Sequence, residues 1–233
     1  MLRTKMIYHL AISVIITSFL PSAANAASCD RATVDTATKP IAEQSASRMD
    51  KAQKMVAYQG QPDILLIGDS IAARWKKDQG RDFDGLSVAN MGLGGERIQE
   101  LRWRLKHLAP KVDPKRVLLI IGTNNLRVKS IATCAVFAGI YAAVNDVKAL
   151  WPDAKLFVMP ILPRGKGFRY RQQDRMEINQ NLSTLNNVTF VKVDEDALTC
   201  GWAKACQNYL TDNVHLAGSG YAILRDGLDR SGF

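Results

Sequence analysis

Short apolar segments alternate with longer stretches of helical periodicity along almost the whole chain. The segment Arg116–Gly122 reads RVLLIIG, and apolar runs of this kind are typical of parallel strands that are buried on both faces. Further strands are expected at 63–68, 86–90, 154–160 and 188–193. Strand–helix alternation over 233 residues predicts an α/β fold, a doubly wound sheet of about five parallel strands with helices on both faces.

Helices are expected where apolar residues recur at intervals of three or four. In the segment 95–108 these residues are Ile98, Leu101, Leu105 and Leu108. The other expected helices span 41–58, 134–151, 172–185 and 217–228, whereas the small, polar segment 27–38 is expected to be irregular. Neither an internal repeat nor a linker interrupts the pattern, which predicts a single domain over 27–233.

The N-terminus has the three parts of a secretory signal peptide. Arg3 and Lys5 form a basic start, an apolar run extends from Met6 to Leu20, and Ala24-Asn25-Ala26 is a small-x-small cleavage site. This run is shorter than the roughly 20 residues that span a membrane. We therefore expect residues 1–26 to be removed and the protein to be periplasmic or secreted, without a stable membrane anchor. An uncleaved anchor is the alternative.

The charge of the chain is positive, and stays so after loss of residues 1–26, which leaves 29 basic and 22 acidic residues. Such a surface favours anionic partners, for example acidic glycans or membrane surfaces, but it also fits a soluble basic protein without such a partner. No basic block or nucleic-acid motif is present, so no nucleic-acid partner is expected. Composition does not predict the oligomeric state.

Four cysteines remain in the mature chain, and an even number in an exported protein indicates disulfides. Four cysteines can form two disulfides in three different ways. The close spacing of Cys200 and Cys206 suits a small loop, so we expect the pairs Cys200–Cys206 and Cys29–Cys134. No Cys-x-x-Cys motif occurs and no histidine lies near a cysteine in sequence, so neither a metal site nor a cofactor is expected.

Residues able to support chemistry follow the expected strands, at the edge where parallel sheets bind ligands. Ser70 follows the first strand, a glycine-rich segment 92–95 follows the second, and Asn124 follows the third. Asp212 and His215 precede the last helix. Each element has a plainer interpretation as well: the serine as a helix cap, the glycines as a loop, and the asparagine as a turn cap.

The joint order of these four blocks resembles the SGNH (GDSL-like) hydrolase superfamily over Pro62 to Leu228. The resemblance is greatest to bacterial GDSL-type esterases and to the catalytic subunits of platelet-activating-factor acetylhydrolase. The stretches 103–106 (WRLK) and 162–165 (LPRG) also look like that branch, whereas Glu96 stands where Asp is common. A resemblance to the α/β-hydrolases is weaker, because Ala72 replaces the last glycine of their nucleophile elbow.

The resemblance implies a role for each of these residues. Ser70 is the expected nucleophile, His215 its base and Asp212 the residue that orients the imidazole, because a serine hydroxyl needs a base to attack. The oxyanion hole is expected from the N–H groups of Ser70 and Gly95 and the side chain of Asn124. The supporting residues are expected to be Asn90, which holds the glycine segment, and Asn125.

The implied activity is that of a serine esterase for short acyl groups, acetyl above all, on a small molecule or on a glycan that carries O-acetyl groups. The loop after the fourth strand contains Arg164, Arg169 and Arg171, which we expect at the rim of the site, where arginine can pair with carboxylates. A solvated basic surface is the alternative. A lysophospholipase or thioesterase, an acyltransferase, and a flavodoxin-like binding module without catalysis remain open.

Overall fold

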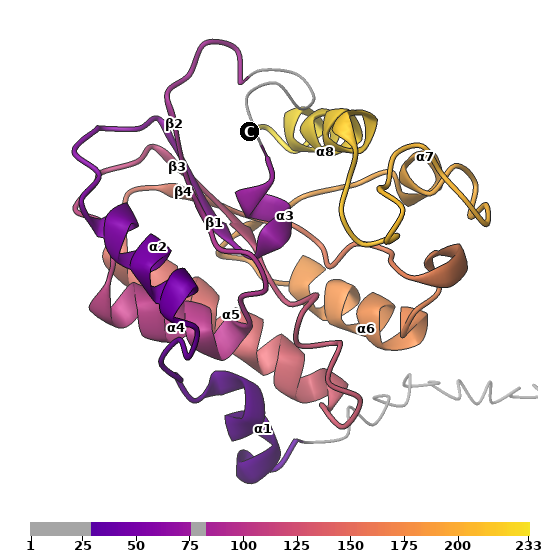
Figure 1. Ribbon diagram of the computed structural model, residues 1–233, viewed down its shortest axis with the longest axis horizontal. Coiled ribbons are helices and arrows are strands. Elements are labelled where there is room, and N and C mark those ends of the chain that lie inside the picture. Colours follow the sequence, from indigo (N-terminus) through magenta and orange to yellow (C-terminus); the bar gives the residue numbers. More distant parts are fainter. Residues whose placement is uncertain (1–28, 76–82) are drawn as a thin grey trace, which may run out of the picture.

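The fold is a five-stranded parallel sheet with helices on both faces, as expected from the sequence (Figure 1). A computed structural model describes residues 29–75 and 83–233, so the signal peptide expected at 1–26 lies outside the described residues. The strands run in the order β2-β1-β3-β4-β5. Their bounds are Ile64–Gly68 (β1), Val88–Gly92 (β2), Arg116–Ile120 (β3), Lys155–Val158 (β4) and Thr189–Phe190 (β5).

Alternate side chains of each strand enter two separate apolar cores. In β1, Leu65 and Ile67 face one core, and Ile64 and Leu66 face the other. The first core is covered by the helices α1 (Arg31–Thr38), α4 (Ile98–His107), α5 (Thr133–Leu150) and α6 (Gln172–Ser183). The second is covered by α3 (Ser70–Ala73), α7 (Glu195–Leu198) and α8 (Gly218–Arg230).

The strand order creates a switch point at the carboxyl ends of β1 and β3. From β1 the chain first adds β2 on one side and then crosses to add β3 on the other. Crevices of open parallel sheets form where the connections diverge in this way. Ser70 follows β1 and Asn124 follows β3, so the fold brings these two residues to the same crevice.

The N-terminal segment differs from the expectation. Residues 31–38, expected to be irregular, form α1, because Asp30 caps its first turn and Ala37 packs closely on Gly139 of α5. Residues 41–58 were expected to form one helix, but α2 spans only Ala46–Val56. The segment before it is held in an irregular path, in which Ile41 N donates to Gln99 O at 3.0 Å.

Two disulfides join the same cysteines that the sequence analysis pairs. Cys29–Cys134 ties the start of α1 to α5 with a Cα–Cα distance of 5.9 Å, and Cys200–Cys206 closes the loop after α7 at 5.6 Å. Helix α5 is long and apolar enough to cross a membrane by composition. Its apolar face instead lies in the core, where Val136, Ile140 and Val144 are buried.

Candidate active site

Ser70, His215 and Asp212 form one hydrogen-bonded line. Ser70 Oγ lies 2.9 Å from His215 Nε2, and His215 Nδ1 lies 2.6 Å from Asp212 Oδ2. The serine is separated from the histidine by 145 positions in sequence, so the fold alone brings them together. This is the arrangement in which an imidazole can remove the proton of a hydroxyl while a carboxylate holds the ring.

Ser70 is the first residue of α3, directly after the carboxyl end of β1. The N-cap of α3 is Asp69, whose Oδ1 accepts from Ile71 N at 2.9 Å, so the interpretation of Ser70 as the helix cap is wrong. Gly92 of β2 lies against the backbone of Ala73, where a Cβ atom would come within 2.2 Å of the Ala73 nitrogen. This close approach fixes α3 against the sheet and fixes Ser70 with it.

The loop that carries Asp212 and His215 is ordered by its own hydrogen bonds. Asp212 Oδ1 accepts from the backbone nitrogens of Val214 and His215, both at 2.9 Å. Leu210 N donates to His215 O at 2.8 Å, which closes the loop at its base. A second contact, from Gly165 N to Asn213 O at 2.8 Å, joins this loop to the segment after β4.

The charge state of Asp212 determines where the protons of the site lie. Burial disfavours its charged form, but the hydrogen bonds from the His215 ring and from two backbone N–H groups outweigh burial and lower the pKa of Asp212 to about 2. At neutral pH the carboxylate is therefore only an acceptor. Nδ1 of His215 then donates to it, and Nε2 is the ring nitrogen that lies next to Ser70 Oγ.

Ser70, Gly95 and Asn124 line the same hollow, and each has a group that can donate a hydrogen bond. Ser70 N lies in the first turn of α3, where backbone N–H groups have no partner within the helix. Gly95 has φ +80°, a conformation that favours glycine, and its N–H donates to no other described residue. Asn124 Nδ2 donates to Glu96 O at 3.0 Å and has a second hydrogen available. Together they can stabilise an oxyanion.

Asn90 and Asn125 hold the surroundings of these donors in place. Asn90 Nδ2 donates to Ala72 O at 2.7 Å, and its Oδ1 accepts from Gly92 N at 2.9 Å, so it joins β2 to α3. Asn125 is fully buried, and its Oδ1 accepts from Ile98 N at the start of α4 at 2.9 Å. Neither side chain lines the hollow in front of Ser70.

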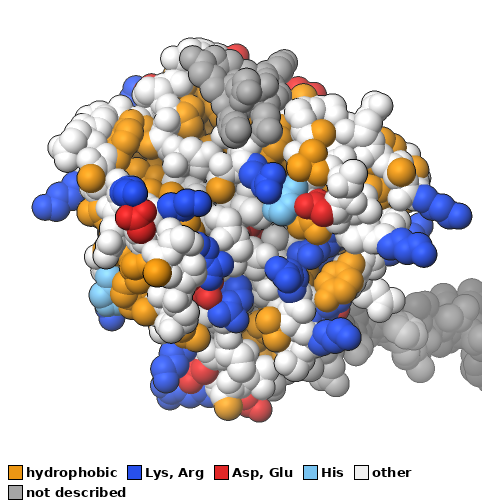
Figure 2. All heavy atoms as spheres, viewed as in Figure 1, with side chains coloured by type: hydrophobic (Ala, Val, Ile, Leu, Met, Phe, Trp, Pro, Cys, Tyr) orange, Lys and Arg blue, Asp and Glu red, His pale blue; other side chains and the backbone are white. Residues whose placement is uncertain are grey.

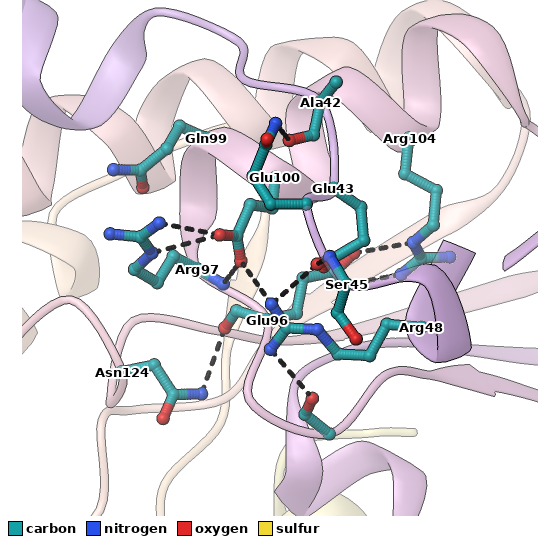
Figure 3. Close-up of polar contacts among 12 residues, drawn as sticks. Ala42, Glu43, Ser45, Arg48, Glu96, Arg97, Gln99, Glu100, Arg104 and Asn124 are labelled. Atoms are coloured by element: carbon teal, nitrogen blue, oxygen red, sulfur yellow. Dashed lines mark hydrogen bonds and ion pairs between the residues drawn. The ribbon is translucent and has the colours of Figure 1, made fainter. Parts of the chain in front are cut away.

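A buried network of charged side chains lies behind the glycine segment (Figure 3). Glu96 accepts two hydrogen bonds from Arg104, at 2.7 and 2.8 Å, and both side chains are almost fully buried. Burial raises the pKa of Glu96, and the Arg104 guanidinium opposes that rise. Glu96, which stands where the resemblance leads one to expect Asp, is therefore bound by Arg104 of the following helix, α4.

Arg48 of α2 reaches the same segment and was not identified from the sequence. Its Nη2 donates to Glu43 Oε1 at 2.7 Å, and its Nη1 lies 3.4 Å from Gly94 O (Figure 3). A Cβ atom on Gly95 would come within 2.7 Å of the same Nη1. No motif marks Arg48, because its role depends on how α2 docks against the glycine segment.

The arginines expected at the rim have different surroundings. Arg164 lines the hollow that contains Ser70, and its Nη1 donates to Thr123 O and Oγ1, both at 2.9 Å. Arg171 does not line it, because its guanidinium is bound to Asp174 and to the carbonyls of Val128 and Ile131. Arg169 does not line it either and instead lies over the ring of Trp202. For these two residues the rim interpretation is corrected.

The hollow in front of Ser70 has a volume of about 580 Å³. Figure 2 shows blue basic side chains gathered around a pale-blue histidine on this face. The lining consists of Lys51, Ser70, Ala73, Arg74, Gly94, Gly95, Asn124, Arg127, Arg164, Val214 and His215. Three of these cations, Lys51, Arg74 and Arg127, were not identified from the sequence. In the described part of the chain, no three His, Cys, Asp or Glu side chains form a group able to hold a metal ion.

Comparison with known proteins places this chain in a family. The model of the GDSL-like lipase/acylhydrolase family matches residues 66–223. Subunit alpha2 of platelet-activating factor acetylhydrolase IB, from Rattus norvegicus and from Homo sapiens, is 31% identical over 169 residues, which are 70% of this chain and 72% of that protein.

Among solved structures, a Streptococcus pneumonia protein described as a platelet activating factor is 25% identical, with a TM-score of 0.64 over 80% of this chain and 91% of its own. The acetylxylan esterase Axe2 from Geobacillus stearothermophilus shares the fold, with a TM-score of 0.56 and 20% identity over 75% of this chain and 96% of its own. The chain belongs to the GDSL-like lipase/acylhydrolase family.

Proposed function

We propose that this acylhydrolase is a serine esterase that removes short acyl groups, acetyl above all, through an acyl-enzyme formed on Ser70. The observation that carries the proposal is the hydrogen-bonded line from Ser70 through His215 to Asp212, with distances of 2.9 and 2.6 Å. A hydroxyl in this position can attack an ester carbonyl as the imidazole takes its proton.

The reaction follows from the positions of these groups. As Ser70 Oγ attacks, His215 Nε2 accepts its proton, and Asp212 stabilises the imidazolium that forms. The negative charge on the carbonyl oxygen develops in front of the N–H groups of Ser70 and Gly95 and the Nδ2 of Asn124. His215 then gives the proton to the leaving alcohol, and a water molecule repeats the sequence to release the acid.

The preference for short acyl groups rests on the lining of the hollow. Among the described residues of this lining, the apolar side chains are Ala73 and Val214, and the remaining positions are glycines or polar residues. A long acyl chain gains its binding energy from contact with apolar side chains, and the two in this lining are small. The name of the curated relatives, acetylhydrolase, agrees with a short acyl group.

The disulfides indicate the compartment in which the enzyme acts. Cys29–Cys134 and Cys200–Cys206 are bonds of the kind that persist in oxidising compartments. We therefore propose that the enzyme acts outside the cytoplasm, on small-molecule or glycan esters.

A series of p-nitrophenyl esters from acetate to palmitate tests this function. We expect kcat/KM to be highest for acetate and to fall with chain length, and we expect Ser70→Ala to abolish turnover of every ester. A maximum at decanoate or beyond would favour the lysophospholipase interpretation. Added alcohol as a second acceptor separates hydrolysis from acyl transfer, because only a transferase forms the new ester in preference to the free acid.

A further inference from the structure

Four cationic side chains line the hollow that contains Ser70, and they come from four separate segments. Lys51 lies on α2, Arg74 follows α3, Arg127 follows β3 and Arg164 follows β4. Among the described side chains of this lining, none is Asp or Glu. The whole chain has 22 acidic and 31 basic residues, so its net charge alone does not account for a lining with four cations and no carboxylate.

Three of these cations have no carboxylate partner within residues 29–75 and 83–233. Lys51, Arg74 and Arg127 are exposed, and none of them forms an ion pair with another described residue. Arginines elsewhere are paired, for example Arg102 with Asp146 and Arg175 with Glu195. Concave surfaces lined by one sign of charge concentrate ligands of the opposite sign.

Arg164 lines the same hollow as Ser70, and its surroundings disfavour the positive charge of its guanidinium. Burial lowers the pKa of its guanidinium and the nearby charge of Arg127 lowers it further, whereas Tyr170, Asp69 and Asp212 only partly oppose this shift. Its Nη1 is committed to Thr123, whereas its Nε is buried without a hydrogen-bond partner in the described structure. Arg127 and Arg164 repel each other, and the carboxylates of Asp69 and Asp212 offset part of this repulsion. An anion that binds in the hollow would relieve the remainder.

We propose that this hollow selects esters whose alcohol part carries an anionic oxygen group, a carboxylate or a phosphate, which Lys51, Arg74, Arg127 and Arg164 bind beside Ser70. The inference rests on the proposed esterase function and names its substrate class. We assign the anion to the alcohol part because Ala73 and Val214, the apolar side chains of the described lining, suit the acyl group, which leaves the four cations to bind the rest of the ester.

Two matched pairs of acetyl esters test this selection. The first pair is O-acetylated glucuronic acid methyl glycoside and O-acetylated methyl glucoside, and the second is acetylated glycerol 3-phosphate and acetylated glycerol. We expect acetate release with kcat/KM roughly tenfold higher for the anionic member of at least one pair. The difference is expected in KM, because the anion is bound equally in the ground state and in the transition state. The pair with the larger ratio identifies the anion.

The double variant Lys51→Gln/Arg127→Gln should reduce the anionic-to-neutral ratio severalfold. The matched control Lys106→Gln/Lys111→Gln removes two exposed charges that do not line the hollow, and it should retain the wild-type ratio. Raising NaCl from about 0.02 M to about 0.5 M should also lower the wild-type ratio, because salt screens exposed charges.

Equal kcat/KM within both pairs would overturn the selection and leave the esterase proposal intact, provided that p-nitrophenyl acetate is hydrolysed. A ratio that falls equally in the Lys51/Arg127 variant and in the control variant would overturn the assignment to these residues. Absence of turnover of p-nitrophenyl acetate itself would overturn the esterase proposal and this inference with it.

Discussion

The two sides of the hollow around Ser70 are built in opposite ways. On the glycine side, residues 92–96, the polar groups have partners within the fold: the buried Glu96 is bound by the buried Arg104, and Gly92 N donates to the side chain of Asn90. On the cationic rim, which consists of Lys51, Arg74, Arg127 and Arg164, three of the four side chains are exposed and have no ion-pair partner in the described structure.

The difference follows from what each side must do. Donors that stabilise a charge present only in the transition state must be held in position before the reaction, because their reorganisation would raise the barrier. Groups that bind the outer part of a substrate can remain solvated until the ligand arrives. Under the proposed function, the buried network supports the oxyanion donors, and the exposed cations bind the substrate.

The largest effect is expected from breaking the buried pair behind the glycine segment. Arg104→Met leaves Glu96 buried without its cation, and loss of one partner of a buried pair costs about 3–5 kcal/mol of unfolding free energy. Denaturant titration with the disulfides intact measures this loss. The control Lys54→Gln removes an exposed ion pair with Asp50 and should cost less than about 1 kcal/mol. If both variants lost the same unfolding free energy, the buried ion pair would contribute no more to stability than the exposed one.

The second effect concerns the neighbouring carboxamides Asn124 and Asn125. Asn124→Ala should lower kcat about 100- to 1000-fold with little change in KM, because an oxyanion donor acts in the transition state. Steady-state kinetics on p-nitrophenyl acetate provides both constants. An effect confined to KM would instead make Asn124 a substrate-binding residue.

Asn125→Ala is the matched comparison, one position away. It removes the acceptor for Ile98 N and the partner of Gln99, so it should lower the unfolding free energy by about 1–3 kcal/mol. If Asn124→Ala and Asn125→Ala both changed only the unfolding free energy, Asn124 would be a supporting residue like Asn125 and not an oxyanion donor.

The effect that is smallest per pH unit is a pH dependence of stability that depends on Asp69. Burial raises the pKa of this carboxyl from 3.8 to about 7. Between pH 4 and pH 7 the folded state therefore binds more protons than the unfolded state, and stability falls as pH rises, by at most about 1.4 kcal/mol per pH unit. Asp69→Asn should remove this slope, as measured by denaturant titration at pH 4, 5, 6 and 7. An unchanged slope would mean that Asp69 titrates outside this range.

Asp212 contributes with the opposite sign and in a different range. Despite the cost of burial, hydrogen bonds to Asp212 lower its pKa from 3.8 to about 2, so the stability that it contributes is present above pH 4 and is lost as pH falls toward 2. The two carboxyls can therefore be separated by the pH range in which each one acts.

The sequence was sufficient for the sheet and for the positions of Ser70, Asn124 and His215, because these depend on local patterns. Apolar runs such as 116–122 predict strands, and residues that follow parallel strands meet at one edge of the sheet. The strand ends were less well placed: β5 covers only Thr189–Phe190 of the expected 188–193.

The errors concern residues whose role depends on tertiary contacts. Residues 31–38 are helical because Asp30 caps the helix and because Ala37 packs on α5, and the second of these contacts has no local signal. Arg171 looked like a rim residue because its loop is basic, yet it binds Asp174 and two carbonyls. Lys51 and Arg127 carry no motif, and only the fold brings them to the hollow.

Covalent labelling of Ser70 tests the central claim most directly. An organic fluorophosphate reacts with a serine that a neighbouring base activates, and the bound phosphoryl group is located by mass spectrometry of the digested protein. We predict a single label on the peptide that contains Ser70, loss of ester turnover in proportion to labelling, no label in Ser70→Ala, and much slower labelling in His215→Ala. Labelling at another residue with full loss of activity, or wild-type turnover by Ser70→Ala, would contradict the account.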